Sequence, residues 1–135
     1  MTTETEIREQ QATQLIAEMK AARGYVYPSH EFAARMDPEF LKAYNTLVGL
    51  ALLHEGVDLE HRALAPKYRE LVVIGILAAR GGTALSHMRR AIELGATEQE
   101  IMEVGQAAVV PAGAPAFLSV MSGLSQLHEE LQNAE

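Results

Sequence analysis

Helix start and stop signals recur along the whole chain, and no run of alternating apolar and polar residues competes with them. Asp37-Pro38 places a capping side chain before a proline at the first helical position. Pro66 opens another helix, and Thr97-Glu98-Gln99-Glu100 forms a capping box that opens a third. Glycines follow these segments, where a left-handed residue ends a helix. The signals predict an all-α, single-domain helical bundle of about six helices.

The spacing of apolar residues predicts where these helices lie. We expect a marginal amphipathic helix over 5–22, an extended link at 25–28, and helices beginning near 38, 66, 83, 97 and 115. Leu71–Ala79 is apolar nearly all round, so its helix is expected to be buried at the centre, in a hairpin with the helix that Thr83 caps. Residues 1–24 are expected to form an N-terminal helical arm, and residues 25–135 a helical domain.

Composition excludes several classes of function. The 135 residues include no cysteine, which excludes thiol redox chemistry, cysteine metal sites and disulfides. A net charge of −7 disfavours nucleic acid and anionic membranes as partners. The absence of cysteine favours a reducing compartment, so we expect a cytoplasmic protein, and the acidic N-terminus is unlike a signal peptide. No spacing of histidines and carboxylates is typical of a metal site, and none is expected.

Two polar residues fall on apolar helix faces. Glu70 stands at the entrance of the most apolar segment, and His87 shares a side of the next helix with alanines and leucine, opposite Ser86. The short Gly81-Gly82 turn folds the two helices back on each other, so carboxylate and imidazole form a possible proton-transfer pair. An early-helix acid that points to water, and a core histidine, are the alternatives.

The chain resembles the carboxymuconolactone decarboxylase family from about Asp37 to Leu127. The resemblance is carried by residues 65–72 (APKYRELV), 87–101 (HMRRAIELGATEQEI) and 112–116 (AGAPA). It implies an alkylhydroperoxidase-like helical fold, a decarboxylase branch without cofactor, small aromatic-derived acids as substrates, and trimers or hexamers. Alkylhydroperoxidase-like relatives also carry a Cys-x-x-Cys pair that is missing here, so no thiol peroxidase activity is expected. Glu70 and His87 carry over, although the segment between them is shorter than in the family.

Decarboxylation leaves an enolate that must be stabilised and then protonated on carbon. Glu70 and His87 are therefore the candidate catalytic residues. A nearby arginine could bind a substrate carboxylate, and Arg80 is preferred because it lies roughly on the Glu70 side of its helix. Arg89 and Arg90 are expected to be surface residues. The complete set of predicted substrate-binding residues is Arg80, Tyr27, His30 and Gly113, with His30 also open to interpretation as a loop histidine.

The sequence thus predicts a cofactor-free enzyme that performs proton-transfer or decarboxylation chemistry on a small carboxylate, lactone or carbonyl compound. A related isomerase or hydratase would use the same groups. The alternative is a non-catalytic oligomer that binds a ligand or serves assembly. A homo-oligomer is expected in either case, because 104–121 is a long, weakly polar stretch that one small domain can hardly bury.

Overall fold

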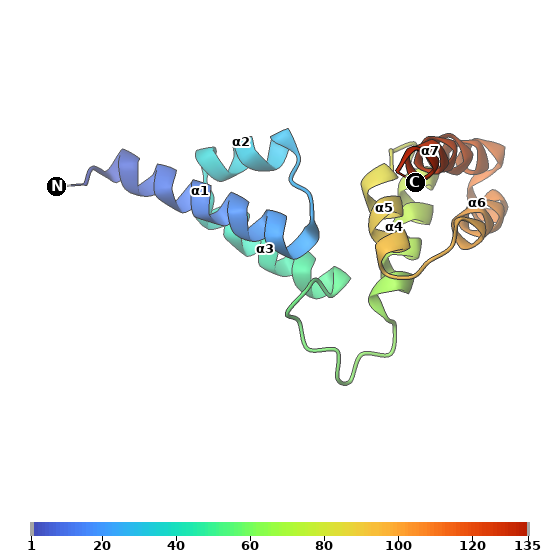
Figure 1. Ribbon diagram of the computed structural model, residues 1–135, viewed down its shortest axis with the longest axis horizontal. Helices are drawn as coiled ribbons and strands as arrows, with labels where there is room; N and C mark the ends of the chain where they lie inside the picture. Colours follow the sequence, from blue (N-terminus) through green and yellow to red (C-terminus); the bar gives the residue numbers. More distant parts are fainter. Residues whose placement is uncertain (1, 135) are drawn as a thin grey trace. The chain divides into compact units, whose positions relative to one another are not determined.

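The computed structural model describes residues 2–134, and the regular structure in that part of the chain is entirely α-helical (Figure 1). The all-α class is confirmed, with one helix more than the six expected among these residues. The helices are α1 (Glu4–Arg23), α2 (Pro28–Met36), α3 (Pro38–Leu52), α4 (Pro66–Ala79), α5 (Leu85–Glu93), α6 (Glu98–Ala112) and α7 (Ala114–Asn133).

The helices form two compact units, one ending at His61 and the other beginning at Arg62. In the first unit α1 packs on α2 and α3. Its buried residues Ala12, Leu15 and Met19 share a core with Ala34 and Leu41. The boundary between the units therefore falls between α3 and α4 and does not coincide with the expected division between an arm, 1–24, and a domain, 25–135.

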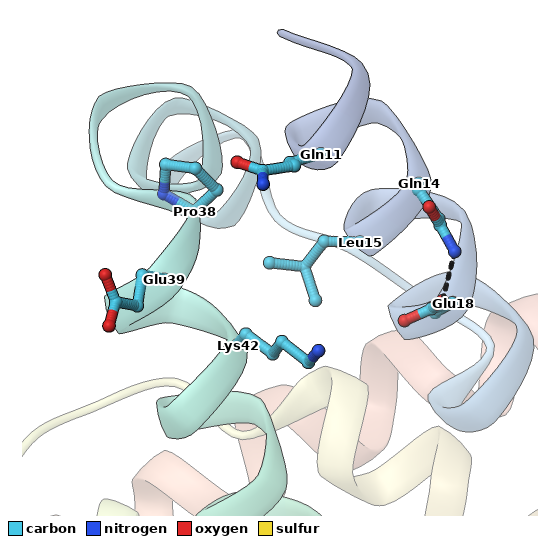
Figure 2. A pocket seen from close by; sticks show the side chains of 7 residues that line it. All are labelled: Gln11, Gln14, Leu15, Glu18, Pro38, Glu39 and Lys42. Atoms are coloured by element: carbon cyan, nitrogen blue, oxygen red, sulfur yellow. Dashed lines mark hydrogen bonds between the residues drawn. The ribbon is translucent and has the colours of Figure 1, made fainter. Parts of the chain in front are cut away.

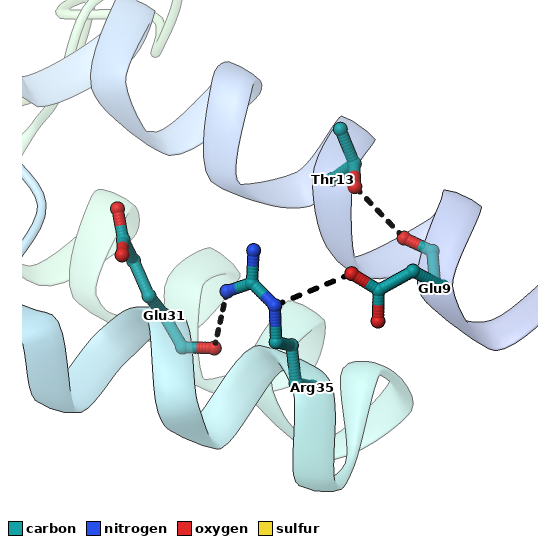
Figure 3. A network of polar contacts seen from close by, with 4 residues as sticks. All are labelled: Glu9, Thr13, Glu31 and Arg35. Carbon is teal, nitrogen blue, oxygen red and sulfur yellow. Dashed lines mark hydrogen bonds and ion pairs between the residues drawn. The ribbon is translucent and has the colours of Figure 1, made fainter.

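Polar contacts fix the ends of α1 and tie it to α2. Thr3 and Glu6 form a capping box at its start, and Gly24, with φ of 80°, ends it in the left-handed conformation. Along the helix, Arg35 Nε of α2 lies 3.3 Å from Glu9 Oε1 of α1 (Figure 3). Both side chains are about half exposed, so this ion pair contributes little to stability.

α2 corrects the expectation that the segment after Tyr27 is a loop. Tyr27 is extended, with φ of −75° and ψ of 153°, as a residue before proline should be. Pro28 then occupies the first helical position, where a missing N–H costs nothing, and the chain continues as a nine-residue helix. Ala34 is its buried residue. Phe32 and Met36, one helical turn apart, are both exposed, so the large apolar residues of this segment do not mark its buried side.

The second unit packs α4, α5, α6 and α7 around one core. The capping box at Thr97 and Glu100 opens α6 as predicted. α6 runs through Pro111 to Ala112, and Gly113, with φ of 78°, makes the break before α7. The fully buried large side chains of this core include Ile74, Met88, Ile101, Val120 and Leu127.

Two expectations about the central hairpin are wrong. α4 is not buried all round, because Val72 is 50% and Ile76 54% exposed on the side that no other helix of the second unit covers. Thr83 does not cap α5, which begins at Leu85 after Ala84 with no side-chain cap. The turn after α4 uses residues through 84, so that Thr83 lies outside the capping position.

Candidate active site

Glu70 lies on the side of α4 that packs into the second unit. Ile74 and Ala78 follow it at steps of four residues and are buried with it. Positions i and i+4 stack on one face of an α-helix, so the carboxylate stands at the start of an apolar stripe. Glu70 is only 1% exposed. An ionised carboxylate at such a position needs a partner that replaces its lost water.

His87 stands on the first turns of α5, at the edge of its buried side. Its side chain is 17% exposed, while Ser86, Met88 and Ala91 are buried. The expectation that Ser86 lies on a solvated flank is therefore wrong. α5 contacts both α4 and α7, so its first turn is covered from more than one side. His87 keeps a narrow access to solvent that Glu70 lacks.

The two side chains meet directly. Glu70 Oε2 lies 2.7 Å from His87 Nδ1, a short separation typical of a charge-assisted hydrogen bond. A carboxylate at Nδ1 holds the imidazole ring in a fixed orientation. The arrangement can act as a general acid or base.

A second pair of the same kind lies on the surface of the second unit. Glu98 Oε1 is 2.8 Å from His128 Nδ1, but these side chains are 38% and 56% exposed. In both pairs a glutamate carboxylate oxygen contacts a histidine Nδ1, but the two pairs differ in burial. Because water screens the exposed pair, it provides an internal control for the buried one.

Two of the three candidate arginines lie apart from this pair. Arg80 caps the end of α4 and is exposed. It stands ten residues after Glu70, which is about 15 Å along the helix axis. Arg89 forms two hydrogen bonds with Glu130, of 2.9 and 2.6 Å, and is a surface ion pair as expected. The Glu130 pKa is lowered by its hydrogen bonds to Arg89.

Arg90 is the functional candidate that the sequence interpretation underestimated. Its side chain is only 20% exposed, and one guanidinium nitrogen, Nη1, lies 3.2 Å from Glu93. Its Nε is buried and has no hydrogen-bond partner. Arg90 follows His87 by three residues on α5, so the two side chains are neighbours on the helix surface. The three-residue spacing from His87 was the signal in the sequence that could have identified Arg90.

Tyr27 and His30 belong to an aromatic cluster in the first unit. The His30 ring centroid lies 5.0 Å from that of Tyr27 and 6.2 Å from that of Tyr44, and Tyr25 lies 5.2 Å from Tyr27. His30 is on α2 rather than in a loop, and its Nδ1 accepts a hydrogen bond from the Tyr27 N–H at 3.2 Å. Burial, with the Arg23 guanidinium nearby, lowers the pKa of His30.

Gly113 is the residue before α7 and has no side chain to cap the helix. Its φ of 78° is left-handed, which explains why glycine occupies the position. The N–H groups of the first turn of α7 follow it. Their use in binding an anion stays a prediction.

Each unit carries surface depressions. A polar pocket of about 350 Å³ lies between α1 and α3 (Figure 2). At its edge, Gln14 donates a hydrogen bond to Glu18 at 3.1 Å. In the second unit an apolar groove of about 590 Å³ runs between α4 and α6, and we call it the α4–α6 groove. Neither Glu70 nor His87 lines either depression. The groove is lined by Leu64, Tyr68, Leu71, Val72, Gly75, Ile76, Ala79, Val104, Ala107, Ala108 and Pro111.

Comparison with known proteins identifies the family. The sequence pattern that defines the carboxymuconolactone decarboxylase family matches residues 38–125, about two thirds of the chain. The chain belongs to this family. The fold is also that of a crystal structure of a protein from Burkholderia xenovorans LB400, whose name assigns it provisionally to carboxymuconolactone decarboxylase. The two chains superpose with a TM-score of 0.74 over 95% of this chain and 98% of the other, at 19% identity.

No curated protein matches the chain. Within residues 2–134, no helix combines the length and apolar character needed to cross a membrane. In the same part of the chain, His, Asp and Glu side chains do not gather in threes as metal ligands would.

Proposed function

We propose that the chain is a cofactor-independent, carboxymuconolactone decarboxylase-like enzyme in which Glu70 and His87 transfer a proton to a small carboxylate, lactone or carbonyl substrate. Family membership supports this class of reaction. The observation that carries the choice of residues is a buried carboxylate 2.7 Å from an imidazole that remains partly open to solvent. Such a pair combines a fixed orientation with access for a substrate.

In the proposed reaction, the bond between the substrate's carboxylate carbon and its neighbouring carbon breaks. Carbon dioxide leaves, and the electron pair stays behind as an enolate. His87, protonated and held by Glu70, donates a proton to the enolate carbon and regains one from solvent. The charge of the imidazolium stabilises the enolate before the proton moves.

We assign the binding of the substrate carboxylate to Arg90 in preference to Arg80. Arg90 is one helical turn from His87 and holds a buried N–H without a protein partner. A substrate oxygen would satisfy that group. Arg90→Met should raise KM more than it lowers kcat, whereas Arg80→Met should change neither by more than about twofold.

The test of the reaction is a spectroscopic turnover screen against muconolactones and related ring-fission acids. With a substrate in hand, Glu70→Gln and His87→Asn should each lower turnover by roughly 10²–10⁴-fold, and the double variant should lose little more. Glu98→Gln and His128→Asn, the same substitutions at the exposed pair, should leave turnover unchanged. Near-wild-type turnover in folded Glu70→Gln protein would contradict the assignment.

A second candidate function is a non-catalytic oligomer that binds a ligand or serves assembly. It is favoured by the position of the Glu70–His87 pair outside both the polar pocket and the α4–α6 groove. In that case the pair stabilises the fold. The screen would then give no turnover, and Glu70→Gln would alter thermal stability alone.

We further propose that the protein is a homo-oligomer, a trimer or hexamer, that acts in the cytoplasm. The stretch 104–121 supports assembly, because Val109, Val110 and Leu118 are 42%, 91% and 62% exposed in a single chain. Light scattering at micromolar concentration should give a mass well above 14.7 kDa. A stable monomer would rule out this part of the proposal.

A further inference from the structure

α3 exposes a continuous apolar stripe along its length. Phe40, Tyr44 and Leu47 follow one another at steps of four and three residues, and Phe40 and Leu47 are 68% and 66% exposed. Such steps place side chains on one side of an α-helix. The alanines at 43 and 51 and Leu50 extend the same side and are also exposed. We call this surface the α3 stripe.

A different side of α3 packs within the first unit. Leu41 and Leu52 are buried, and between them Asn45 accepts a hydrogen bond of 2.6 Å from Arg23 of α1. α3 is therefore apolar on two sides, and α1 and α2 cover one of them. A solvated helix face normally carries charged residues, so the α3 stripe has the composition of a contact surface.

The α4–α6 groove of the second unit has matching properties. Its rim on α4 is formed by Tyr68, Val72 and Ile76, which are 40–60% exposed and repeat at steps of four residues. Small residues of α6, Ala107 and Ala108, form part of the opposite wall. No charged side chain lines the groove, although charged residues make up 21% of the sequence.

We propose that the α3 stripe of one copy docks into the α4–α6 groove of a second copy. An apolar helix face with anchors at i, i+4 and i+7 is what a hydrophobic groove between two helices accepts. The chain is acidic overall, with a charge of −7, so a contact between copies through uncharged surfaces avoids bringing like charges together. The stripe and the groove are such surfaces.

The α3 stripe offers part of the area that a stable contact needs. An aromatic side chain buries roughly 150–250 Å² when it is fully covered. Because Phe40 is 68% exposed, covering it would bury on the order of 100 Å² or more. With Tyr44, Leu47, Leu50 and the alanines, the stripe offers several hundred Å². A stable interface needs about 800 Å² from each partner, including its polar rim. The stripe can supply the apolar centre of that area.

A second copy fits these surfaces better than a small substrate does. A substrate carboxylate in the α4–α6 groove would lose its water and find no charged partner there. Each copy has one stripe and one groove, so the contact is head-to-tail and can close into a ring of copies. The inference does not depend on the proposed reaction, since assembly is measured without a substrate.

The absence of native cysteine makes the contact directly testable by cross-linking. A tagged Leu47→Cys chain and an untagged Ile76→Cys chain are expressed together and oxidised. The tag distinguishes the mixed disulfide from either homodimer. We expect the mixed disulfide to be the main product, at about twice the 14.7 kDa of one chain. Lys42→Cys, on a different exposed side of the same helix, is the matched control and should give little of it.

A second experiment places charge in the contact. Leu47→Glu should weaken association by at least about tenfold and shift the mass toward the monomer, because the new carboxylate must be desolvated. Lys42→Glu makes the chain more negative on a different exposed side of α3 and should leave the mass unchanged. Circular dichroism should show full helix content in both variants.

Three outcomes would overturn the proposal. In the first, a chain that carries both Leu47→Cys and Ile76→Cys forms its disulfide within a monomer, and the two single variants give no mixed dimer. The stripe would then dock in the groove of its own chain. A monomeric wild type would leave both surfaces for a different partner. An unchanged mass for Leu47→Glu, together with no mixed disulfide, would place the contact between copies elsewhere.

Discussion

The contact between Glu70 and His87 should be measurable as stability, whatever the substrate proves to be. The Glu70 side chain is 2% exposed, and its hydrogen bond to the imidazole is 2.7 Å long. Hydrogen bonds to charged groups contribute about 1.5–3 kcal/mol. Glu70→Ala removes this bond, strands an imidazole N–H and leaves a small void, so the free energy of unfolding should fall by about 2–4 kcal/mol. Glu70→Gln keeps the shape and an acceptor oxygen and should cost about 1 kcal/mol.

A double-mutant cycle separates the contact from these other effects. Glu70→Ala, His87→Ala and the double variant are unfolded in urea at one protein concentration and followed by circular dichroism. We expect a coupling energy of about 1–3 kcal/mol. The same cycle at Glu98 and His128 should give less than about 1 kcal/mol, because that pair is exposed to water and salt.

The comparison between the two cycles decides whether burial matters. Equal coupling energies at both pairs, or less than about 0.5 kcal/mol at Glu70 and His87, would refute the argument that burial strengthens this bond. The proposed catalytic role would then lose its structural basis, since a weakly held imidazole is not oriented by its carboxylate.

Three further predictions concern stability alone. Thr97→Ala removes the cap of α6 and should lower the free energy of unfolding, measured in urea, by about 0.5–2 kcal/mol. Thr83 does not cap α5, so Thr83→Ala should lower it by less than about 0.5 kcal/mol. Gly105→Ala should lower the melting temperature more than Gly123→Ala, since its new methyl group lies 3.0 Å from Cβ of a buried valine, whereas at Gly123 it meets the flexible end of a methionine. Burial lowers the pKa of His30, so the folded state favours the neutral imidazole. The melting temperature should therefore fall as the pH drops below about 6.5, the usual pKa of histidine, and His30→Gln should make this fall smaller.

The features that were predicted correctly depend on neighbours in sequence. The capping box at Thr97 and the proline start at Pro66 need only the residues within one helical turn, so they could be recognised without the fold. The meeting of Glu70 and His87 also followed from a local argument, because two polar groups on apolar faces flank one short turn. Which imidazole nitrogen makes the contact depends on the packing of α5 and could not be predicted.

The features that were missed depend on what packs against each helix. Ser86 and Val72 have the opposite burial from the one expected, because a single sequence shows a helix's apolar residues but not which neighbours cover them. Arg90 was assigned to the surface for the same reason, although its Nε is buried. α2 was missed because Pro28 was placed in an extended link, 25–28, although proline also begins helices.

The two roles assigned to the second unit meet on one helix. Glu70, Ile74 and Ala78 occupy the buried side of α4, whereas Val72 and Ile76 lie on the opposite side and line the α4–α6 groove. Both sides of α4 therefore require apolar residues, which explains why Leu71–Ala79 carries no charge although Val72, Ile76 and Ala79 are exposed in a single chain. A charged residue on the outer side would solubilise the single chain and disrupt the groove. Retaining apolar residues there is physically sensible if the groove is covered, as the proposed contact with the α3 stripe requires.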